Sequence, residues 1–246
     1  MTGPDMLVLA GATLLASFIK GGAGMGAGLF LQPALTLIFD PFTALALSSP
    51  ILLYSDGIGL IAYRREWIES RRLFRLLAAC ILGSVLGVLT VPLVSANTVK
   101  LIVGICGISF TLSKCVHKAA DTSPQPVPWP ILFLSAVAGG FFNAVANAGG
   151  IFFAYCCLRM NLQPRTFVAT IVIVVFTTSL IKVPGYLSLG VLSEEQLIRT
   201  LPLIPIVFTG AMLGSRCNKL ISPKLFKKAV LMLIGIMSGS TLITLL

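Results

Sequence analysis

Long apolar runs separated by short polar segments extend along the whole chain. A helix that crosses a membrane needs about 20 consecutive, mostly apolar residues. Uninterrupted spans of about this length are predicted at 43–63, 73–93, 98–115, 166–189, 196–215 and 225–246. The pattern therefore predicts an all-α polytopic membrane protein.

Two further apolar runs, at 5–39 and 129–158, are each interrupted by small and polar residues. A short second apolar run follows each break, which predicts a pair of half-helices. The residues that mark the breaks are Lys20, Gly24, Gly26 and Gly28 in the first run, and Asn143, Asn147, Gly149 and Gly150 in the second. Paired interrupted segments in the two halves of a membrane protein indicate a transport site.

The two breaks belong to a longer internal repeat. An offset of 123 residues places Gly24 on Asn147, Gly26 on Gly149, and segment 41–46 on 164–169. An offset of 127 places Gly83-x-x-x-Gly87 on Gly210-x-x-x-Gly214. Such pairs of small residues let helices approach closely in lipid. We therefore expect a first repeat at 1–116, a linker at 117–128 and a second repeat at 129–246.

The basic residues decide between two topologies. Fourteen of the 18 Lys and Arg residues fall within 64–75, 114–118, 159–165 and 216–228. If both broken segments crossed the membrane fully, the last cluster would face outward. If each is a re-entrant hairpin, all 14 residues face the cytoplasm, as the excess of positive charge in cytoplasmic loops requires. The prediction is two inverted repeats, each a broken re-entrant hairpin plus three transmembrane helices, with both termini outside and the linker in the cytoplasm.

Composition excludes a soluble protein. Hydrophobic residues make up 57% of the chain and charged residues 11%, whereas a soluble domain carries roughly 25% charged residues. The net charge of +10 lies in clusters at the ends of the spans, where it contacts membrane lipid and sets topology. We expect no nucleic-acid partner.

The breaks offer a chemistry suited to anions. A helix that restarts inside the membrane leaves its first N–H groups without partners, and its dipole adds positive charge there. Asn143 and Asn147 add side-chain donors. Lys20 ends the first half-helix, and an ammonium at the bilayer centre costs roughly 2.5–3.5 kcal/mol. Lys20 therefore either binds substrate or lies shallower and extends to a headgroup.

Two more charges lie within the predicted spans. Asp56 is the only acidic residue inside a full crossing, and an offset of 126 places it on Lys182 and Gly59 on Gly185. Asp56 is either a buried ion-pair partner of one of the lysines or a protonatable coupling residue. Lys182 either serves function or extends to the outer surface. Other polar residues at membrane depth are interpreted as structural, with Ser and Thr bonded to their own helices: Gln32, Ser48, Ser49, Tyr155, Thr177, Thr178 and Ser179.

Catalytic signatures are missing from the sequence. It contains no zinc-ligand spacing, nucleophile elbow, Walker motif or carboxylate pair, and the only histidine is His117 in the linker. We expect no enzyme activity, no cofactor and no metal, so that transport would run on a gradient. The alternatives are a non-transporting membrane scaffold or assembly factor, and a passive anion channel. The channel is disfavoured because no ring of charged residues lines any one span.

Several motifs identify a family resemblance. They are Gly24-Met-Gly-Ala-Gly28, Phe30-Leu-Gln-Pro33, Asp40-Pro-Phe-Thr-Ala-Leu-Ala46, Asn147-Ala-Gly-Gly150 and Ser222-Pro-Lys-Leu-Phe-Lys-Lys228. In their order and spacing the chain resembles the sulfite exporter TauE/SafE family of anion permeases, over about 7–246. The resemblance implies an inner-membrane carrier for sulfur-containing anions, namely sulfite, thiosulfate or an organosulfonate. Such a carrier would work by alternating access, with protons as a candidate coupling ion.

Overall fold

A computed structural model describes residues 3–23, 26–63, 69–116, 127–160, 162–220 and 223–245. These residues are helical almost throughout and contain no strand, which confirms the all-α prediction. The first half contains α1 (Gly3–Ala23), α2 (Ala27–Thr36), α3 (Pro41–Ala62), α4 (Ser70–Thr90), η1 (Val91–Leu93) and α5 (Ala96–Val116). The second half contains α6 (Trp129–Ala146), α7 (Gly150–Arg159), α8 (Pro164–Ser188), α9 (Glu194–Thr200), η2 (Leu201–Leu203), α10 (Ile204–Leu220) and α11 (Pro223–Ile243). Most of the predicted linker, 117–126, lies outside the described residues.

Several helices are long and apolar enough to cross a membrane. Among the described residues these candidate spans are Asp5–Gly22, Pro41–Ile61, Arg71–Leu93, Trp129–Ala146, Arg165–Ser188 and Glu194–Cys217. The outer face of α4 exposes large apolar side chains, including Leu82, Leu86 and Leu89. Soluble monomers rarely expose continuous apolar surface of this kind, so this face suits lipid. The protein is a multi-pass membrane protein.

Both predicted breaks are present as reversals of the chain. Gly26, the residue before α2, has a φ of 96°, in the left-handed region. Asn147, which ends α6, has a φ of 53°. Glycine and asparagine tolerate this region better than other residues, so each helix ends and a second one starts within a few residues.

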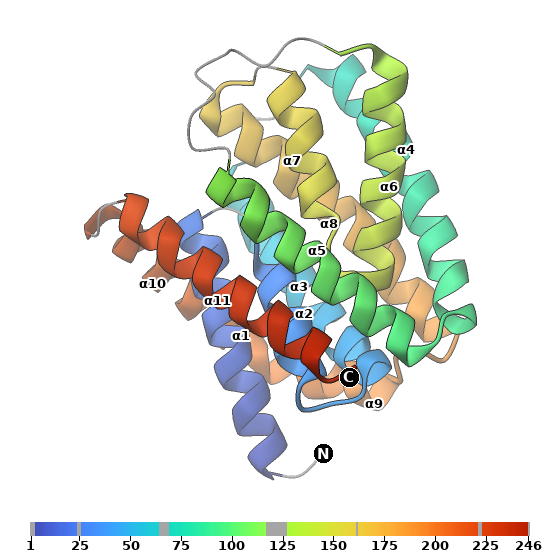
Figure 1. Ribbon diagram of the computed structural model, residues 1–246, viewed down its shortest axis with the longest axis vertical. Helices are drawn as coiled ribbons and strands as arrows, with labels where there is room; N and C mark the ends of the chain where they lie inside the picture. Colours follow the sequence, from blue (N-terminus) through green and yellow to red (C-terminus); the bar gives the residue numbers. More distant parts are fainter. Residues whose placement is uncertain are drawn as a thin grey trace.

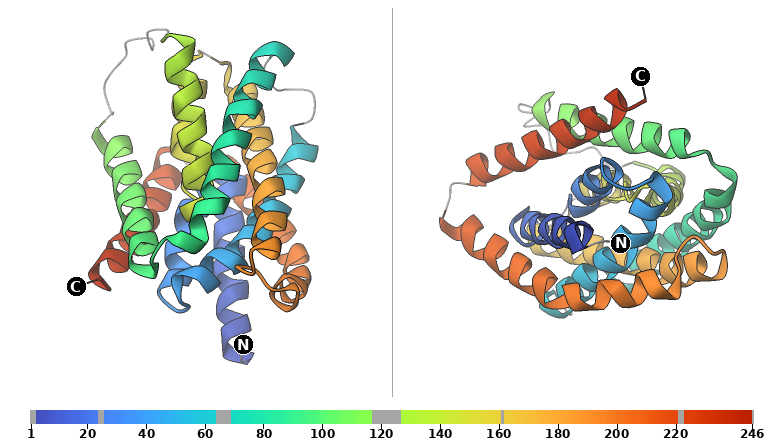
Figure 2. Two further views of the ribbon diagram at one scale, coloured as in Figure 1. Left: turned by 90° about the vertical axis from the view of Figure 1, so that its right-hand side faces the viewer. Right: turned by 90° about the horizontal axis from the view of Figure 1, so that it is seen from below.

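The two helix pairs enter the molecule from opposite ends. In Figure 1, α1 starts at the bottom and α2 returns there, whereas α6 starts at the top and α7 returns there. Figure 2, viewed from below, shows α4, α5, α10 and α11 around these four helices. The two inner ends meet, because Gly28 of α2 lies against the backbone carbonyl of Asn147 so closely that a Cβ atom would not fit.

Glycines create the closest helix contacts. Gly83 and Gly87 of α4 lie against the α6 backbone, and Gly210 and Gly214 of α10 lie against the α1 backbone. A Cβ atom at any of the four would come closer than 3.0 Å to a neighbouring atom. The predicted close approach at both glycine pairs is therefore confirmed, and it joins the first helix of each half to a helix of the other half.

One predicted span differs from the structure. Where the hydropathy pattern predicts a single helix at 196–215, α9 ends at Thr200, a 3₁₀ turn follows, and α10 starts at Ile204. Pro202 and Pro205 lie at this junction. Proline has no N–H to donate to the helical ladder, and this explains the interruption.

Candidate anion-binding site

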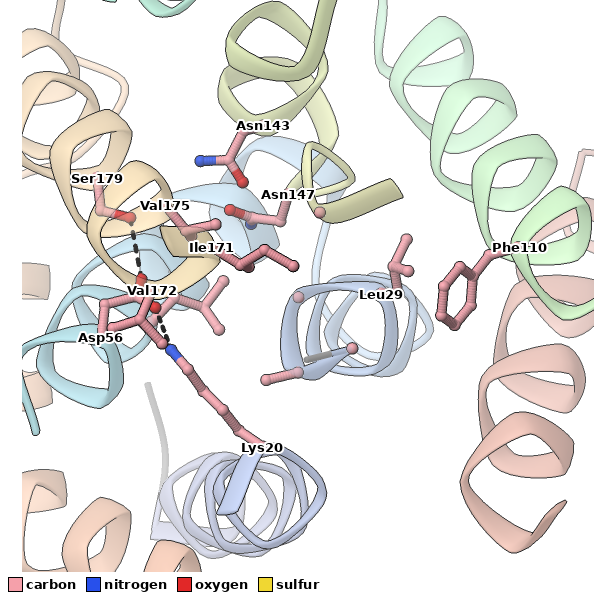
Figure 3. Close-up of a pocket in the computed structure, with 15 residues that line it drawn as sticks. Lys20, Leu29, Asp56, Phe110, Asn143, Asn147, Ile171, Val172, Val175 and Ser179 are labelled. Carbon is pink, nitrogen blue, oxygen red and sulfur yellow. Dashed lines mark hydrogen bonds and ion pairs between the residues drawn. The ribbon is translucent and has the colours of Figure 1, made fainter. Parts of the chain in front are cut away.

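A cavity of about 50 Å³ lies where the two breaks meet. Helices α1, α2, α3, α5, α6, α7 and α8 contribute to its wall (Figure 3). The predicted site residues that line it are Lys20, Gly26, Gly28, Asn143, Asn147 and Gly150, together with Asp56. Gly149 and Lys182 are not among the lining residues, and Gly24 lies outside the described residues.

An ion pair joins α1 to α3 at the edge of this cavity. The Lys20 ammonium donates to Oδ1 of Asp56, and the Ser179 hydroxyl donates to Oδ2 at 3.4 Å (Figure 3). Asp56 is 1% exposed and Lys20 14% exposed. Lys20 therefore does not extend to a headgroup, and Asp56 is a buried ion-pair partner, one of the two roles that the sequence left open.

Lys182 points into the protein. Its side chain is 1% exposed, and its ammonium donates to Oδ1 of Asn147 and, at 3.5 Å, to the carbonyl of Asn143. The alternative that Lys182 extends to the outer surface is therefore wrong. Both partners lie at the inner end of α6, so Lys182 holds this end of the helix directly behind the cavity wall.

An amide and hydroxyl network connects the two breaks. The Asn147 side-chain amide donates to Oε1 of Gln32 at 2.9 Å and to the Ser48 hydroxyl at 2.8 Å. The Asn143 amide donates to the Thr178 hydroxyl at 2.7 Å. The sequence predicted both asparagines as donors to an anion. Asn147 donates twice to protein acceptors, whereas Asn143 donates once and has a second N–H. They fix the shape of the site.

Backbone amides, Lys20 and the second N–H of the Asn143 side-chain amide are the candidate donors to a guest. The first hydrogen bond of α2 runs from the Phe30 N–H to the Gly26 carbonyl, so the N–H groups before Phe30 have no partner within the helix. The start of α7 at Gly150 lines the same cavity. Two helix N-termini with their positive dipole ends and one ammonium therefore surround a small space.

One known protein family matches nearly the whole sequence. The family described as Sulfite exporter TauE/SafE matches residues 9–241. The chain belongs to this family. No curated protein and no solved structure matched it significantly. Membership indicates that this TauE/SafE protein is a membrane anion transporter.

Part of the TauE/SafE cavity wall had no signal in the sequence. Phe110 of α5 and the apolar residues Leu52, Ile171 and Val175 line the cavity. Apolar residues of a membrane helix look alike whether they face lipid or a site, so only the packing of the helices identifies them. Ser179, by contrast, stood out as a polar residue at membrane depth.

The structural interpretation holds for two of the other polar residues, whereas Ser179 lines the cavity. The hydroxyls of Ser49 and Thr177 donate to carbonyls one turn earlier in their own helices, at 2.6 and 2.8 Å.

No group of three or more His, Cys, Asp or Glu residues that could hold a metal ion occurs within the described part of the TauE/SafE chain.

Proposed function

We propose that this TauE/SafE protein is a secondary transporter of a small sulfur-containing anion, namely sulfite, thiosulfate or an organosulfonate, across the cytoplasmic membrane. One observation carries the proposal. The cavity at the meeting point of two helix breaks is bounded by the N-termini of α2 and α7 and by Lys20. Backbone N–H groups near 26–28 and 149–151 would bind the anion, and Lys20 would supply the countercharge.

The size and charge of the site favour a compact oxyanion. A cavity of about 50 Å³ holds a few waters or one small ion. Asp56 is the only carboxylate among the lining residues, and it already pairs with Lys20. An anion that replaces Asp56 as the partner of Lys20 would keep this ammonium paired inside the protein. Sulfite fits these limits better than a bulky organosulfonate.

Asp56 suggests how transport is coupled. Its carboxylate already binds the ammonium that the substrate would use. The charged groups that face Asp56 are Lys20 from α1 and Lys182 from α8, and Ser179 donates to its second oxygen. Protonation of Asp56 would release Lys20 to the anion. The anion would then cross together with a proton.

The arrangement of the hairpins supports alternating access by two inverted repeats. The outer ends of α1 and α2 lie at one end of the molecule, and those of α6 and α7 at the other (Figure 1). The contact of α1 with α10 corresponds to that of α6 with α4. In this proposal both termini lie outside and 117–128 lies in the cytoplasm, so that rocking of the halves exposes the site to each side in turn.

Uptake by the purified protein in proteoliposomes tests the proposal. The substrates are sulfite, thiosulfate and methanesulfonate, with phosphate and acetate as controls. We expect saturable uptake of a sulfur oxyanion that an inward proton gradient stimulates. Asp56→Asn should lose this stimulation but keep anion counterflow. Uptake no greater than in protein-free liposomes would reject transport and favour a scaffold, and flux that does not saturate would favour a channel.

A further inference from the structure

A second cavity leads away from the site toward one end of the molecule. It has a volume of about 260 Å³, lies between α1, α3, α8 and α10, and is lined by Lys20, which also lines the central cavity. Its wall includes Tyr63, which directly follows α3, and Ser215 of α10. In the sequence these two residues adjoin the basic segments 64–75 and 216–228. The second cavity therefore opens toward the end that the charges assign to the cytoplasm.

The opposite end of the site is packed shut. Val88 of α4, Tyr186 of α8 and Leu45 of α3 belong to one buried apolar cluster. Gly185 lies so close to α4 that a Cβ atom there would stand 2.7 Å from Cγ1 of Val88. The Tyr186 hydroxyl donates to the carbonyl of Ala144, which attaches α8 to the inner end of α6. This apolar seam separates the central cavity from the end of the molecule opposite the basic loops.

The open and the closed regions are counterparts in the two repeats. The offsets found in the sequence pair four residues of the closed seam with four that line the second cavity. The pairs are Leu45 with Val168, Val88 with Ser215, Ala144 with Gly21, and Gly185 with Gly59. The same structural position is therefore packed in one half of the molecule and open in the other.

We infer that this structure is the state open to the side of the basic loops, and that the opposite state closes Gly59 onto Ser215 while Gly185 separates from Val88. In a protein built from inverted repeats, the second state forms when the two repeats exchange conformations. Glycine on one side of each seam lets the helix backbones meet without a side chain between them. The inference rests on the proposed transport function and identifies the two gates of the path.

A disulfide across the closed seam tests the inference. The Cβ position of Gly185 lies 3.6 Å from Cβ of Val88, within the 3.5–4.5 Å range of disulfides. The variant is Val88→Cys/Gly185→Cys, and the controls are Val88→Cys alone under the same oxidant and the double variant under reductant. We expect oxidation to abolish sulfite uptake and a reductant to restore it. Uptake by the oxidised variant at the reduced rate, or thiols that stay free under oxidant, would overturn the inference.

Accessibility gives a second readout that needs no transported substrate. Ser215 lines the second cavity and is exposed. In the locked protein, Ser215→Cys should react with a membrane-impermeant maleimide from the cytoplasmic side only, above the background that the native cysteines set. Reaction from the outer side only would overturn the inference. A different outcome separates the inference from the proposed function. If neither the wild type nor the reduced variant takes up sulfite, but labelling occurs from the cytoplasmic side only, the proposed substrate is wrong and the gate assignment stands.

Discussion

Removal of Lys20 should affect stability and transport in separable ways. In Lys20→Gln, Asp56 stays buried at 1% exposure and keeps only the Ser179 hydrogen bond and the more distant charge of Lys182. Breaking a buried ion pair from one side costs about 3–5 kcal/mol. Lys20 is 14% exposed, so water partly solvates the pair, and we expect the lower limit of about 3 kcal/mol.

The double variant Lys20→Gln/Asp56→Asn should recover most of this loss, because no unpaired carboxylate remains. In double-mutant cycles, residues in direct contact have interaction free energies of about 0.5–3 kcal/mol. For Lys20 and Asp56 we expect a value in the upper part of this range. Sulfite binding should not recover, because the ammonium is still missing. Lys20→Arg keeps the charge, so it should lose less stability and less sulfite binding than Lys20→Gln, and less sulfite binding than the double variant.

The assay combines thermal unfolding in detergent with sulfite uptake in proteoliposomes. It compares wild type, the single variants Lys20→Gln and Asp56→Asn, and the double variant. A Lys20→Gln protein as stable as wild type would show that the ion pair contributes little. A double variant that takes up sulfite at the wild-type rate would refute the role of Lys20 in anion binding, whatever its stability.

Two further predictions concern the fold. Gly83→Ala should destabilise the protein by about 1–3 kcal/mol, because the new methyl group overlaps the α6 backbone. The control is Gly11→Ala, where nothing lies within 4 Å of the new Cβ atom. Equal melting temperatures of the two variants would contradict the prediction. Asp40 caps α3 by accepting from the N–H groups of Phe42 and Thr43 at 3.1 Å, so Asp40→Ala should cost about 1 kcal/mol. Partial burial raises the pKa of Asp40, but these hydrogen bonds outweigh it and the pKa lies below 3.8. The stabilisation by the Asp40 cap should therefore be constant above pH 3.8 and shrink as the pH falls through the lowered pKa. Melting curves of wild type and Asp40→Ala at a series of pH values measure it. A stability difference that grows on acidification would contradict the prediction.

Hydropathy and glycine spacing predicted much of the fold because they act locally. The breaks at Gly26 and Asn147 follow from residues that tolerate a positive φ and interrupt an apolar run. The close contacts at Gly83 and Gly210 follow from small residues spaced four apart. The interruption after Thr200 was missed because the apolar pattern continues through it, and only the prolines indicate it.

The site was less predictable because it depends on which helices pack together. The sequence allowed Asp56 to pair with either lysine, and the packing of α1 beside α3 selects Lys20. The inward direction of Lys182 depends on its contact with the end of α6, far away in the sequence. Asn143 and Asn147 are polar at the right depth, but a count of donors cannot show that neighbouring side chains already accept from them.

The central claim is that an anion binds where the two helix breaks meet, and Gly150→Ala tests it most directly. Gly150 lines the cavity, and a Cβ atom there meets nothing within 4 Å. The substitution should leave stability equal or raise it by up to about 1 kcal/mol while it places a methyl group where the anion would bind. Gly239→Ala on α11, which also meets nothing within 4 Å, is the matched control.

The measurement is the increase in melting temperature that sulfite produces, since a ligand that binds only the folded state raises its stability by about 2.7 kcal/mol at 100 times its Kd. We predict that sulfite stabilises wild type and Gly239→Ala equally and stabilises Gly150→Ala much less. Equal stabilisation of all three proteins would contradict the claim that the anion lies between the ends of α2 and α7.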